Sequence, residues 1–440
     1  MSTGDTPWSG RALHFVGIGG AGMSGLALIA HRLGARVTGS DRVATPYMAE
    51  LRALGIEPAI GHRAENVPPG AELVYSSAVA SDNPERVAGA RELHRADLLG
   101  EITRLRRCIA VTGTHGKTTT SAMIVHALQG AGMDPSYAIG GELRATGANA
   151  GWGTGEWLVV EADESDRSLL KLSAEIAVLT NAELDHHATY ASLADLEATF
   201  ARFMADAEHR VVWDRPELRA LCPPNTETFD APDPELGPDG SRFAWRGLEV
   251  NVGVPGAHNA RNAAAALTAA SRAGADPAKA AASLASFTGA RRRMELLGHT
   301  PTGAAVYDDY AHHPTEVAAV IAAARSMRPR RVVAVFQPHL FSRTRALADG
   351  FGRALAAADV VVVLGIYPAR ERAADFPDVS GRLVAAAAAD AAGGRPVAWV
   401  PEFADAERLL RSALREGDLC LVIGAGDVDA LGRRLVAIAT

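Results

Sequence analysis

The stretch VTGTHGKTTT, residues 111–120, constrains the fold more than any other part of the sequence. An apolar, strand-like run at 108–112 leads into a glycine-rich turn at 113–116, and Lys117 then opens a segment compatible with a helix. This order gathers backbone N–H groups and a helix N-terminus around one point, which favours bound phosphate. The stretch therefore predicts a nucleotide-binding α/β domain.

Two side chains of this stretch have the chemistry that a nucleotide triphosphate requires. Lys117 is expected to reach the outer phosphates, and the Thr118 hydroxyl is expected to hold Mg²⁺. The usual loop has four residues between its glycines, whereas only Thr114 and His115 intervene here. The chain has only three lysines (Lys117, Lys171 and Lys279), and one stands where phosphate chemistry needs it. An ordinary turn before a helix is the weaker interpretation.

Length and charge restrict the remaining classes. A chain of 440 residues predicts two to four domains. A net charge of −7 argues against sequence-independent nucleic-acid binding, which needs a basic face. No apolar run reaches the ~18 residues of a membrane span, and the N-terminus lacks the pattern of a secretory signal. Three distant cysteines indicate buried thiols, so a cytoplasmic location is expected.

Strand-like and helix-like segments alternate in three blocks, the pattern of parallel α/β sheets. We predict an N-terminal Rossmann-like domain (residues 1–103), a central P-loop-type domain (104–298) and a C-terminal Rossmann-like α/β domain (299–440). The stretch 223–239 is rich in Pro, Asp and Gly, and we interpret it as a surface loop.

A second glycine-rich turn lies near the N-terminus. Residues 17–22 fit G-x-G-x-x-G between a strand and a helix, and Asp41 follows 19 residues beyond Gly22. This is the dinucleotide fingerprint in its usual context, so an oxidoreductase is one interpretation. The fingerprint itself requires only a pyrophosphate and a ribose, and a nucleotide sugar supplies both. A first block of about 100 residues leaves little room for a complete dinucleotide fold.

Acidic residues and histidines follow two strand-like runs of the second block. The segment EADESD at 161–166 places four carboxylates after an apolar strand, where α/β sheets bind ligands. Carboxylate oxygens suit Mg²⁺, although a solvated acidic loop is the alternative. The segment TNAELDHH at 180–187 adds two acids and two histidines beside a second strand end. These residues predict a metal or phosphate site.

Taken together, these motifs resemble the ATP-dependent Mur ligase family over nearly the whole chain. Eight motifs occur in the order expected for that family: GIGGAGMSGLA (17–27), GTHGKTTT (113–120), EADESD (161–166), TNAELDHH (180–187), HNARNAAAA (258–266), GARRRM (289–294), DDYAHHPTEV (308–317) and FQPHLFSRTRAL (336–347). The last two point to the member of the family that adds L-alanine.

The resemblance implies a reaction and its reactants. It implies that ATP and Mg²⁺, with Mn²⁺ as a substitute ion, drive attachment of L-alanine to the lactyl carboxylate of UDP-N-acetylmuramate during peptidoglycan synthesis. An acyl phosphate would be the intermediate, and ADP and phosphate would be released. A monomer or homodimer is expected, with no nucleic-acid partner. Two further interpretations stay open: a sibling ligase that attaches a preformed peptide, and a nucleotide switch or motor.

The resemblance also implies roles for individual residues. Lys117, Glu161 and His186 would be catalytic, and Thr118, Glu161 and His186 would hold metal. The ATP site would comprise Gly113, Thr114, His115, Gly116, Lys117, Thr118, Thr119, Asn259, Asn262, Arg293 and Asp309. The UDP-sugar site would comprise Gly17, Gly19, Gly20, Gly22, Ser40, Asp41, Ser76 and Ser77. The amino-acid pocket would comprise Tyr310, His312, His339 and Arg343.

Two positions depart from the pattern of the family. The resemblance implies two Mg²⁺ ions, one held by Thr118 and Glu161 and a second held by His186. Several related ligases carry a carbamoylated lysine where this chain has Phe200, so the second ion must rely on His186, phosphate and water. Some members have an arginine where this chain has Leu340, so recognition of a carboxylate rests more heavily on Arg343.

Overall fold

The computed structural model describes residues 6–88, 91–186 and 189–437. The chain divides into two compact units, each of which combines two stretches of sequence. Unit 1 comprises Met1–Asp230 and Asn262–Leu284, and unit 2 comprises Ala231–Arg261 and Ala285–Thr440. His187 of the TNAELDHH motif lies outside the described residues.

The first part of unit 1 is a five-stranded parallel sheet with the order β3-β2-β1-β4-β5. Its strands are β1 (Ala12–Val16), β2 (Arg36–Asp41), β3 (Ala59–Ile60), β4 (Glu72–Tyr75) and β5 (Glu92–His94). Its helices are α1 (Ala21–Arg32), α2 (Met48–Ala53), α3 (Pro84–Val87) and α4 (Arg95–Thr103), with the 3₁₀ turn η1 (Ala64–Asn66). The glycine-rich turn at 17–22 joins β1 to α1, as predicted.

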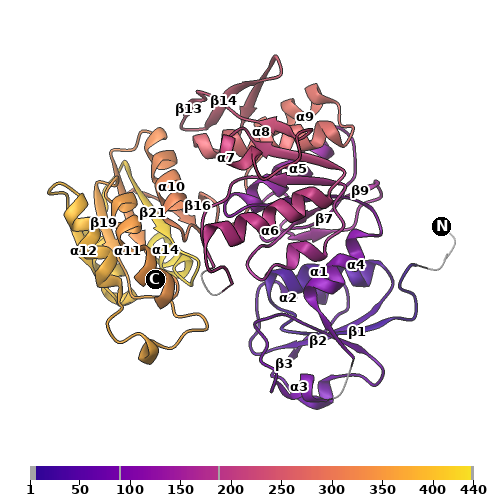
Figure 1. The fold of residues 1–440 in the computed structure, drawn as a ribbon. Coiled ribbons are helices and arrows are strands. Elements are labelled where there is room, and N and C mark those ends of the chain that lie inside the picture. The colour runs from indigo at the N-terminus through magenta and orange to yellow at the C-terminus, as the bar shows by residue number, and fades with distance from the viewer. Residues whose placement is uncertain (1–5, 89–90, 187–188, 438–440) are drawn as a thin grey trace. The chain divides into compact units, whose positions relative to one another are not determined.

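The second part of unit 1 is a seven-stranded sheet with the order β12-β11-β10-β6-β9-β7-β8, in which β8 alone is antiparallel to its neighbour. Its strands are β6 (Arg107–Thr112), β7 (Ser136–Ala138), β8 (Ala150–Gly151), β9 (Trp157–Glu161), β10 (Ile176–Leu179), β11 (His209–Trp213) and β12 (Glu227–Phe229). Its helices are α5 (Lys117–Gly130), α6 (Leu193–Asp206), α7 (Pro216–Arg219) and α9 (Pro277–Ser283), with the 3₁₀ turn η2 (Ser168–Lys171) (Figure 1). Helix α8 (Ala257–Arg272) contains the boundary between the two units, and the 3₁₀ turn η3 (Leu284–Ser286) follows α9.

The centre of this sheet brings the predicted site residues together. Strand β6 pairs with β10 on one side and with β9 on the other, all in parallel. The four residues of β10 are fully buried, as expected for a central strand covered on both faces. Because parallel strands end at the same edge, the phosphate loop after β6, the acids after β9 and the TNAELDHH segment after β10 share one edge.

Unit 2 contains a small antiparallel sheet and a six-stranded sheet with the order β16-β17-β21-β18-β19-β20. The small sheet is formed by β13 (Glu235–Gly237), β14 (Gly240–Trp245) and β15 (Leu248–Val252). The larger sheet is formed by β16 (Glu295–His299), β17 (Ala305–Asp309), β18 (Arg331–Phe336), β19 (Val360–Val363), β20 (Val397–Trp399) and β21 (Asp418–Ile423), and only β16 is antiparallel to its neighbour.

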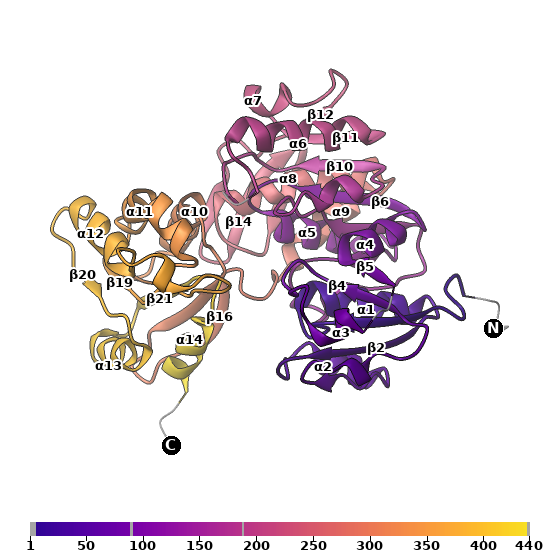
Figure 2. The ribbon, with the colours of Figure 1, turned by 60° about the horizontal axis from the view of Figure 1, so that its bottom comes forward.

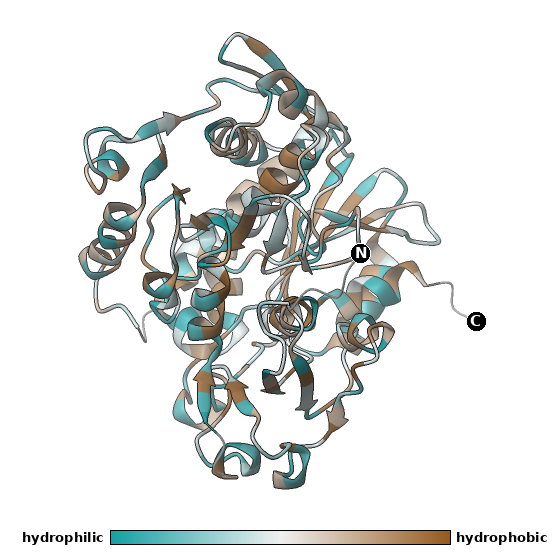
Figure 3. Ribbon diagram, turned by 90° about the vertical axis from the view of Figure 1, so that its right-hand side faces the viewer, coloured by the Kyte–Doolittle hydropathy of each residue, from teal (hydrophilic) through white to brown (hydrophobic). Residues whose placement is uncertain are grey.

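Helices cover both faces of the larger sheet (Figure 2). One face carries α10 (Pro314–Ser326), α11 (Phe341–Leu355) and α12 (Gly381–Ala391), and the other carries α13 (Phe403–Ala413) and α14 (Asp429–Val436). Each layer has its own apolar core against the sheet. In Figure 3 the helices carry both brown and teal residues, as expected for helices with one buried and one exposed side.

The structure confirms most of the predicted elements and corrects one of them. The stretch 223–239 is not only a loop, because β12 and β13 lie within it. Both strands are three residues long and lie at sheet edges, so the Pro, Asp and Gly residues around them concealed the pattern. The predicted boundary at residue 298 falls inside β16, and the domain limits stay predictions. Among residues placed by the structure, no helix has both the length and the apolar character needed to cross a bilayer.

Candidate functional site

The loop between β6 and α5 needs its two glycines for steric reasons. Gly113 has φ +126°, and a Cβ there would lie 2.2 Å from Thr180 Oγ1. Gly116 is the N-cap of α5 with φ +78°, and a Cβ there would lie 2.8 Å from Asn262 Oδ1. Only a residue without a side chain fits this close approach of backbone to its surroundings. The loop therefore forms a tight cradle before the helix N-terminus, which fits a bound phosphate group.

The peptide group of His115 is fixed from the neighbouring strand end. Its N–H donates to Asn181 Oδ1 at 2.8 Å, and its carbonyl accepts from Asn181 Nδ2 at 2.9 Å and from Thr180 Oγ1 at 2.7 Å. Thr114 Oγ1 accepts from the backbone N–H of Glu183 at 2.9 Å and donates to the carbonyl of the same residue at 2.8 Å. Thr180, Asn181 and Glu183 of the TNAELDHH segment thus hold the phosphate loop in one conformation.

Lys117 lies over this loop and pairs with a buried carboxylate. Its Nζ donates to the carbonyls of Gly113 at 2.8 Å and Thr114 at 3.2 Å, and it lies 2.8 Å from Glu164 Oε2. Burial acts to lower the pKa of Lys117, but the charges of Glu164, Asp163 and Glu161 outweigh it and raise that pKa. The lysine is therefore a fixed positive charge beside the phosphate loop.

Thr118 and Glu161 form the second polar group of the site. Thr118 Oγ1 donates to Glu161 Oε2 at 2.9 Å, and the backbone N–H of Gly140 donates to the same oxygen at 2.8 Å. A hydroxyl and a carboxylate are the hard oxygen ligands that Mg²⁺ prefers, and here they lie together at the helix N-terminus. These two residues fit the predicted metal site.

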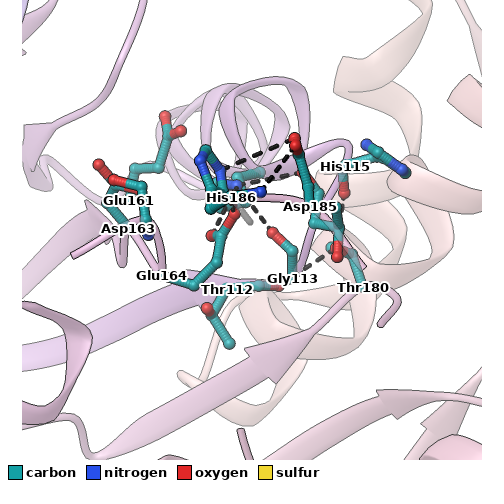
Figure 4. Close-up of polar contacts among 12 residues, drawn as sticks. Thr112, Gly113, His115, Glu161, Asp163, Glu164, Thr180, Asp185 and His186 are labelled. Carbon is teal, nitrogen blue, oxygen red and sulfur yellow. Dashed lines mark hydrogen bonds and ion pairs between the residues drawn. The ribbon is translucent and has the colours of Figure 1, made fainter. Parts of the chain in front are cut away.

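His186 approaches the same point from the end of β10. Its Nε2 lies 3.3 Å from Glu164 Oε1 and 3.8 Å from Asp185 Oδ2. His186 has φ +53°, in the left-handed region that few residues other than glycine occupy. Figure 4 shows His186, Glu164 and Gly113 gathered around one point, so the phosphate loop after β6 and the segments after β9 and β10 meet there.

The acidic segment after β9 is balanced by a cation from the N-terminal part of unit 1. Arg95 Nη2 lies 3.1 Å from Asp163 Oδ2 and 3.5 Å from Asp166 Oδ2. Although burial acts to raise it, the pKa of Asp163 is lowered to about 2 by the charges of Lys117 and Arg95. The segment is thus partly neutralised and is not simply a solvated acidic loop.

A cavity of about 150 Å³ lies between the N-terminal glycine-rich turn and the edge of the central sheet, within unit 1. Its wall includes Ala21 and Gly22 from the start of α1, and Gly140 and Glu161 from the edge of the central sheet. Arg95 and Asp163 also line it. The predicted UDP-sugar loop and the predicted metal-binding carboxylate therefore face one space.

The turn at 17–22 is closed by Asp41. Asp41 Oδ2 accepts the N–H of Gly19 at 3.0 Å, and Thr45 Oγ1 donates to the carbonyl of Gly19 at 2.8 Å. A Cβ on Gly19 would lie 2.7 Å from Thr45 Oγ1, and Gly17 has φ +79°. Gly20 is the N-cap of α1.

The three predicted serines have different surroundings. Ser40 is fully buried, and its Oγ donates to Glu85 Oε2 at 2.5 Å and lies 2.9 Å from His62 Nδ1. Ser76 and Ser77 follow β4 and are half-buried and exposed, respectively. The Ser40 hydroxyl is thus engaged within the protein, whereas Ser76 and Ser77 lie at a strand end that solvent reaches.

In helix α8, the two predicted asparagines fall on either side of the unit boundary. Asn262, in unit 1, lies against Gly116 of the phosphate loop. Asn259, in unit 2, is buried, and its Nδ2 donates to the carbonyl of Pro255 at 2.7 Å. Thr119 is buried in the first turn of α5.

In unit 2, Asp309 ends β17 as a buried carboxylate. It accepts the N–H groups of Met294 and Ala311, both at 2.8 Å. Burial raises the pKa of Asp309 to about 6, against the opposing charge of Arg293. The Arg293 guanidinium lies 5.4 Å from the ring centroid of Tyr310 and 3.7 Å from Glu316 Oε1. Arg293 and Asp309 are therefore neighbours within unit 2.

The four predicted amino-acid pocket residues also cluster within unit 2. The rings of Tyr310 and His312 have centroids 5.5 Å apart, and those of His312 and His339 are 6.3 Å apart. Arg343 is buried, and its Nη1 donates to His339 Nδ1 at 3.1 Å. Tyr367, which the sequence did not single out, stacks on His339 with centroids 5.8 Å apart.

The two departures from the family pattern have clear structural settings. Phe200 lies on the buried side of α6, within the apolar core, and its side chain has no atom that could bind a metal ion. Leu340 is the N-cap of α11 with φ +67° and ψ 136°, an unfavourable backbone conformation for leucine. Its N–H donates to the carbonyl of Tyr367 at 2.9 Å, which helps to hold this conformation.

Sequence reasoning missed the individual roles of Asn181, Glu164 and Tyr367. Asn181 and Glu164 lie inside motifs that the sequence did identify, so their position at strand ends was the available signal. Tyr367 follows β19 in the same way, but it belongs to none of the eight motifs.

Comparison with known proteins matches three successive stretches of the chain to domain families. Residues 12–107 match the Mur ligase family catalytic domain, residues 111–270 the Mur ligase middle domain, and residues 292–426 the Mur ligase glutamate ligase domain. These stretches follow the three predicted blocks in order, which confirms the predicted three-domain α/β architecture.

Relatives of similar length carry one common name, UDP-N-acetylmuramate–L-alanine ligase. The protein from Bifidobacterium longum is 41% identical, covering 97% of this chain and 93% of the relative. The protein from Rubrobacter xylanophilus is 42% identical, covering 97% and 99%. The crystal structure of the Thermotoga maritima UDP-N-acetylmuramate–alanine ligase superposes with a TM-score of 0.82 at 29% identity, covering 97% of this chain and 98% of that one.

Proposed function

The chain belongs to the Mur ligase family, and from this membership we propose that it joins L-alanine to the lactyl carboxylate of UDP-N-acetylmuramate at the expense of ATP. The relatives that carry this activity in their names match almost the full length of the chain. ADP and phosphate are the other products, and the nucleotide-linked product serves peptidoglycan synthesis.

One geometric observation carries the proposal. Glu161 lies 2.9 Å from Thr118 of the phosphate loop and also lines the cavity that Gly22 of the N-terminal glycine-rich turn lines. A carboxylate substrate whose nucleotide is held by the N-terminal turn thereby has a route to the triphosphate held by the phosphate loop. This juxtaposition supports phosphoryl transfer from ATP to a nucleotide-sugar carboxylate.

The first chemical step brings two anions together. The lactyl carboxylate attacks the γ-phosphorus of ATP, ADP leaves, and an acyl phosphate forms. Two unit charges ~4 Å apart repel by roughly 4 kcal/mol at an effective dielectric near 20. Lys117 offsets part of this repulsion, and its bonds to the loop carbonyls hold its charge at the phosphates. One Mg²⁺ ion held by Thr118 and Glu161, and a second held by His186, would supply further positive charge to the transferring group.

The second step uses the residues of unit 2. The free amine of L-alanine attacks the acyl carbon, and phosphate leaves from the tetrahedral intermediate. We assign the amino-acid pocket to Tyr310, His312, His339 and Arg343, with the Arg343 guanidinium as the partner of the alanine carboxylate. Asn259, Asn262, Arg293 and Asp309 are assigned to the nucleotide. A cytoplasmic location and a monomeric or homodimeric state complete the proposal.

The competing interpretations differ in their support. The oxidoreductase interpretation leaves the phosphate loop without a role, and membership of a ligase family removes its basis. A ligase that attaches a preformed peptide shares the fold, since the murein peptide ligase of Psychrobacter arcticus superposes with a TM-score of 0.72 at 23% identity. That likeness shows the fold alone, so the acceptor must be tested directly.

The test is phosphate release from ATP and Mg²⁺ in the presence of UDP-N-acetylmuramate, with and without L-alanine. Release that depends on both reactants, with a matching mass gain on the nucleotide sugar, is the expected result. Glycine, L-serine and a tripeptide are compared with L-alanine at equal concentration. Release that ignores L-alanine but responds to the tripeptide would identify the peptide-adding sibling, and no release in any combination would contradict the proposal.

A further inference from the structure

Glu164 is a fully buried carboxylate that contacts two predicted catalytic residues at once. Its side chain is 0% exposed, whereas the side chains of Lys117 and His186 are 13% and 24% exposed. Oε1 lies 3.0 Å from Lys117 Nζ and 3.3 Å from His186 Nε2, and Oε2 lies 2.8 Å from Lys117 Nζ. Lys117 opens α5 after β6 and His186 follows β10, and the Glu164 side chain joins them.

The backbone of Glu164 is itself firmly held. Its carbonyl accepts the Tyr190 hydroxyl at 2.6 Å and the N–H of Arg167 at 2.9 Å. Tyr190 is only 1% exposed and belongs to the core that α6 covers. Because these hydrogen bonds hold the backbone of Glu164, its carboxylate is kept in contact with Lys117 and His186.

The three acceptors of Lys117 show what a nucleotide must change. The ammonium group has three protons, and it contacts the carbonyls of Gly113 and Thr114 as well as Glu164. A phosphate oxygen that binds Lys117 must share it with these acceptors or displace one of them. Of the three, only Glu164 carries a full negative charge, so it is the strongest competitor for the lysine.

We propose that Glu164 is a positioning residue that holds Lys117 and His186 together over the phosphate loop, and that its charge competes with nucleotide phosphates for Lys117. This inference rests on the proposed function for the roles of Lys117 and His186. Two effects of opposite sign are expected when the charge of Glu164 is removed. Nucleotide binds more tightly, because the competitor is gone, and turnover slows, because the two residues lose their common anchor.

The experiment compares Glu164→Gln, Glu164→Asp and Glu175→Gln with the wild-type protein. Glu175 pairs with Arg107 where β10 and β6 begin, at the sheet edge opposite to the phosphate loop, so Glu175→Gln removes the same charge far from the site. Binding of ATP in EDTA is measured by calorimetry, and kcat and KM for ATP are measured with UDP-N-acetylmuramate, L-alanine and Mg²⁺.

For Glu164→Gln we expect ATP binding in EDTA to tighten by roughly tenfold. We expect kcat to fall by roughly 10- to 100-fold, as for other residues that orient metal-site side chains. Glu164→Asp keeps the charge on a shorter stem, so kcat falls while the affinity for metal-free ATP stays near wild type. Glu175→Gln changes neither quantity.

Two results would overturn the inference: wild-type turnover by Glu164→Gln, or ATP binding in EDTA that is no tighter than that of the wild type. If Glu164→Gln does not fold, wild-type kcat in Glu164→Asp overturns it instead. If the wild-type protein ligates no acceptor, the proposed function fails, but the comparison of ATP binding still decides whether Glu164 competes for Lys117.

Discussion

Thr118 Oγ1 donates a 2.9 Å hydrogen bond to Glu161 Oε2, which ties the first turn of α5 to the end of β9. The same carboxylate oxygen accepts the N–H of Gly140 at 2.8 Å, so Glu161 is oriented by two donors. This hydroxyl–carboxylate pair lies directly beside the phosphate loop. If it holds Mg²⁺, changes at Thr118 must act on the metal requirement.

The first prediction concerns Thr118 and Mg²⁺. Thr118→Val removes the hydroxyl while keeping the branched shape, and we expect the Mg²⁺ concentration for half-maximal activity to rise by roughly 10- to 100-fold. Thr118→Ser keeps the hydroxyl and should stay near wild type. Activity titrated against Mg²⁺ at saturating ATP measures this directly. An unchanged Mg²⁺ requirement in Thr118→Val would remove Thr118 from the metal site.

The second prediction concerns Lys117 and its buried partner. Lys117→Ala should abolish ligation but keep the fold, as judged by circular dichroism. It should also lower the free energy of unfolding by about 3 kcal/mol or more, because Glu164 remains buried without its cation. Adding Glu164→Gln to Lys117→Ala should restore part of this stability and none of the activity. Urea unfolding of the single and double variants tests this, and additive losses of stability would contradict the pairing.

The third prediction uses two glycines with positive φ around α5. A Cβ at Gly113 meets Thr180 Oγ1 at 2.2 Å and Asn181 O at 2.9 Å, whereas Gly132, with φ +84°, has open space around it. Gly132→Ala should lower the free energy of unfolding by about 1 kcal/mol, from backbone strain alone. Gly113→Ala should lower the free energy of unfolding by more than Gly132→Ala does. It should also weaken ATP binding, because Thr180 and Asn181 support the loop. Equal losses of stability in the two variants would show that the cradle tolerates a side chain.

The sequence predicted those parts of the site that depend on local backbone pattern. Each glycine-rich turn lies between the predicted strand and helix, and the acidic and histidine segments follow β9 and β10. These predictions succeeded because strand, turn and helix signals are local, and because parallel strands bring their carboxyl ends to one edge. The roles of individual residues stay predictions.

The contacts between distant residues could not be predicted in this way. Glu85 lies 71 positions from His14, and Tyr367 lies 28 positions from His339, yet each pair is in contact. Such pairings depend on the order of strands in the sheet, which the sequence pattern leaves open. The short strands β12 and β13 were missed for another reason, since three-residue edge strands have too few residues to show an alternating pattern.

The fourth prediction compares two arginines of α11. Arg343 is buried and donates to His339, whereas Arg345 is exposed two residues further along the helix and lies over the Phe376 ring. Arg343→Lys should raise the KM for L-alanine by roughly 10- to 100-fold, because a lysine cannot reproduce the planar set of donors. Arg345→Lys should leave that KM near the wild-type value. Initial rates against L-alanine at saturating ATP test this, and equal KM values for both variants would place Arg343 outside the pocket.

The last prediction concerns Glu85, whose carboxylate accepts a hydrogen bond from Ser40 in β2. Its side chain is fully buried, and its oxygens contact Ser40, Asn66 and the N–H of Arg63 at 2.5, 2.6 and 3.2 Å. His14 Nε2 and His62 Nδ1 lie 3.5 and 3.4 Å from the same carboxylate. Burial acts to raise the pKa of Glu85, but these hydrogen bonds outweigh it and lower the pKa to about 2.

A pKa that is lower in the folded state makes the ionised form a stabilising contribution. That contribution is fully present above pH 4.5, the ordinary value for the side chain, and is lost as the pH falls toward 2. Between pH 6 and pH 3 the loss amounts to about 2 kcal/mol. Urea unfolding should therefore show that the stability difference between the wild type and Glu85→Gln shrinks by this amount on acidification. Glu65→Gln, at an exposed position nearby, should follow the wild type at every pH. A stability difference between the wild type and Glu85→Gln that stays constant with pH would show that the pKa of Glu85 is the same in the folded and the unfolded protein.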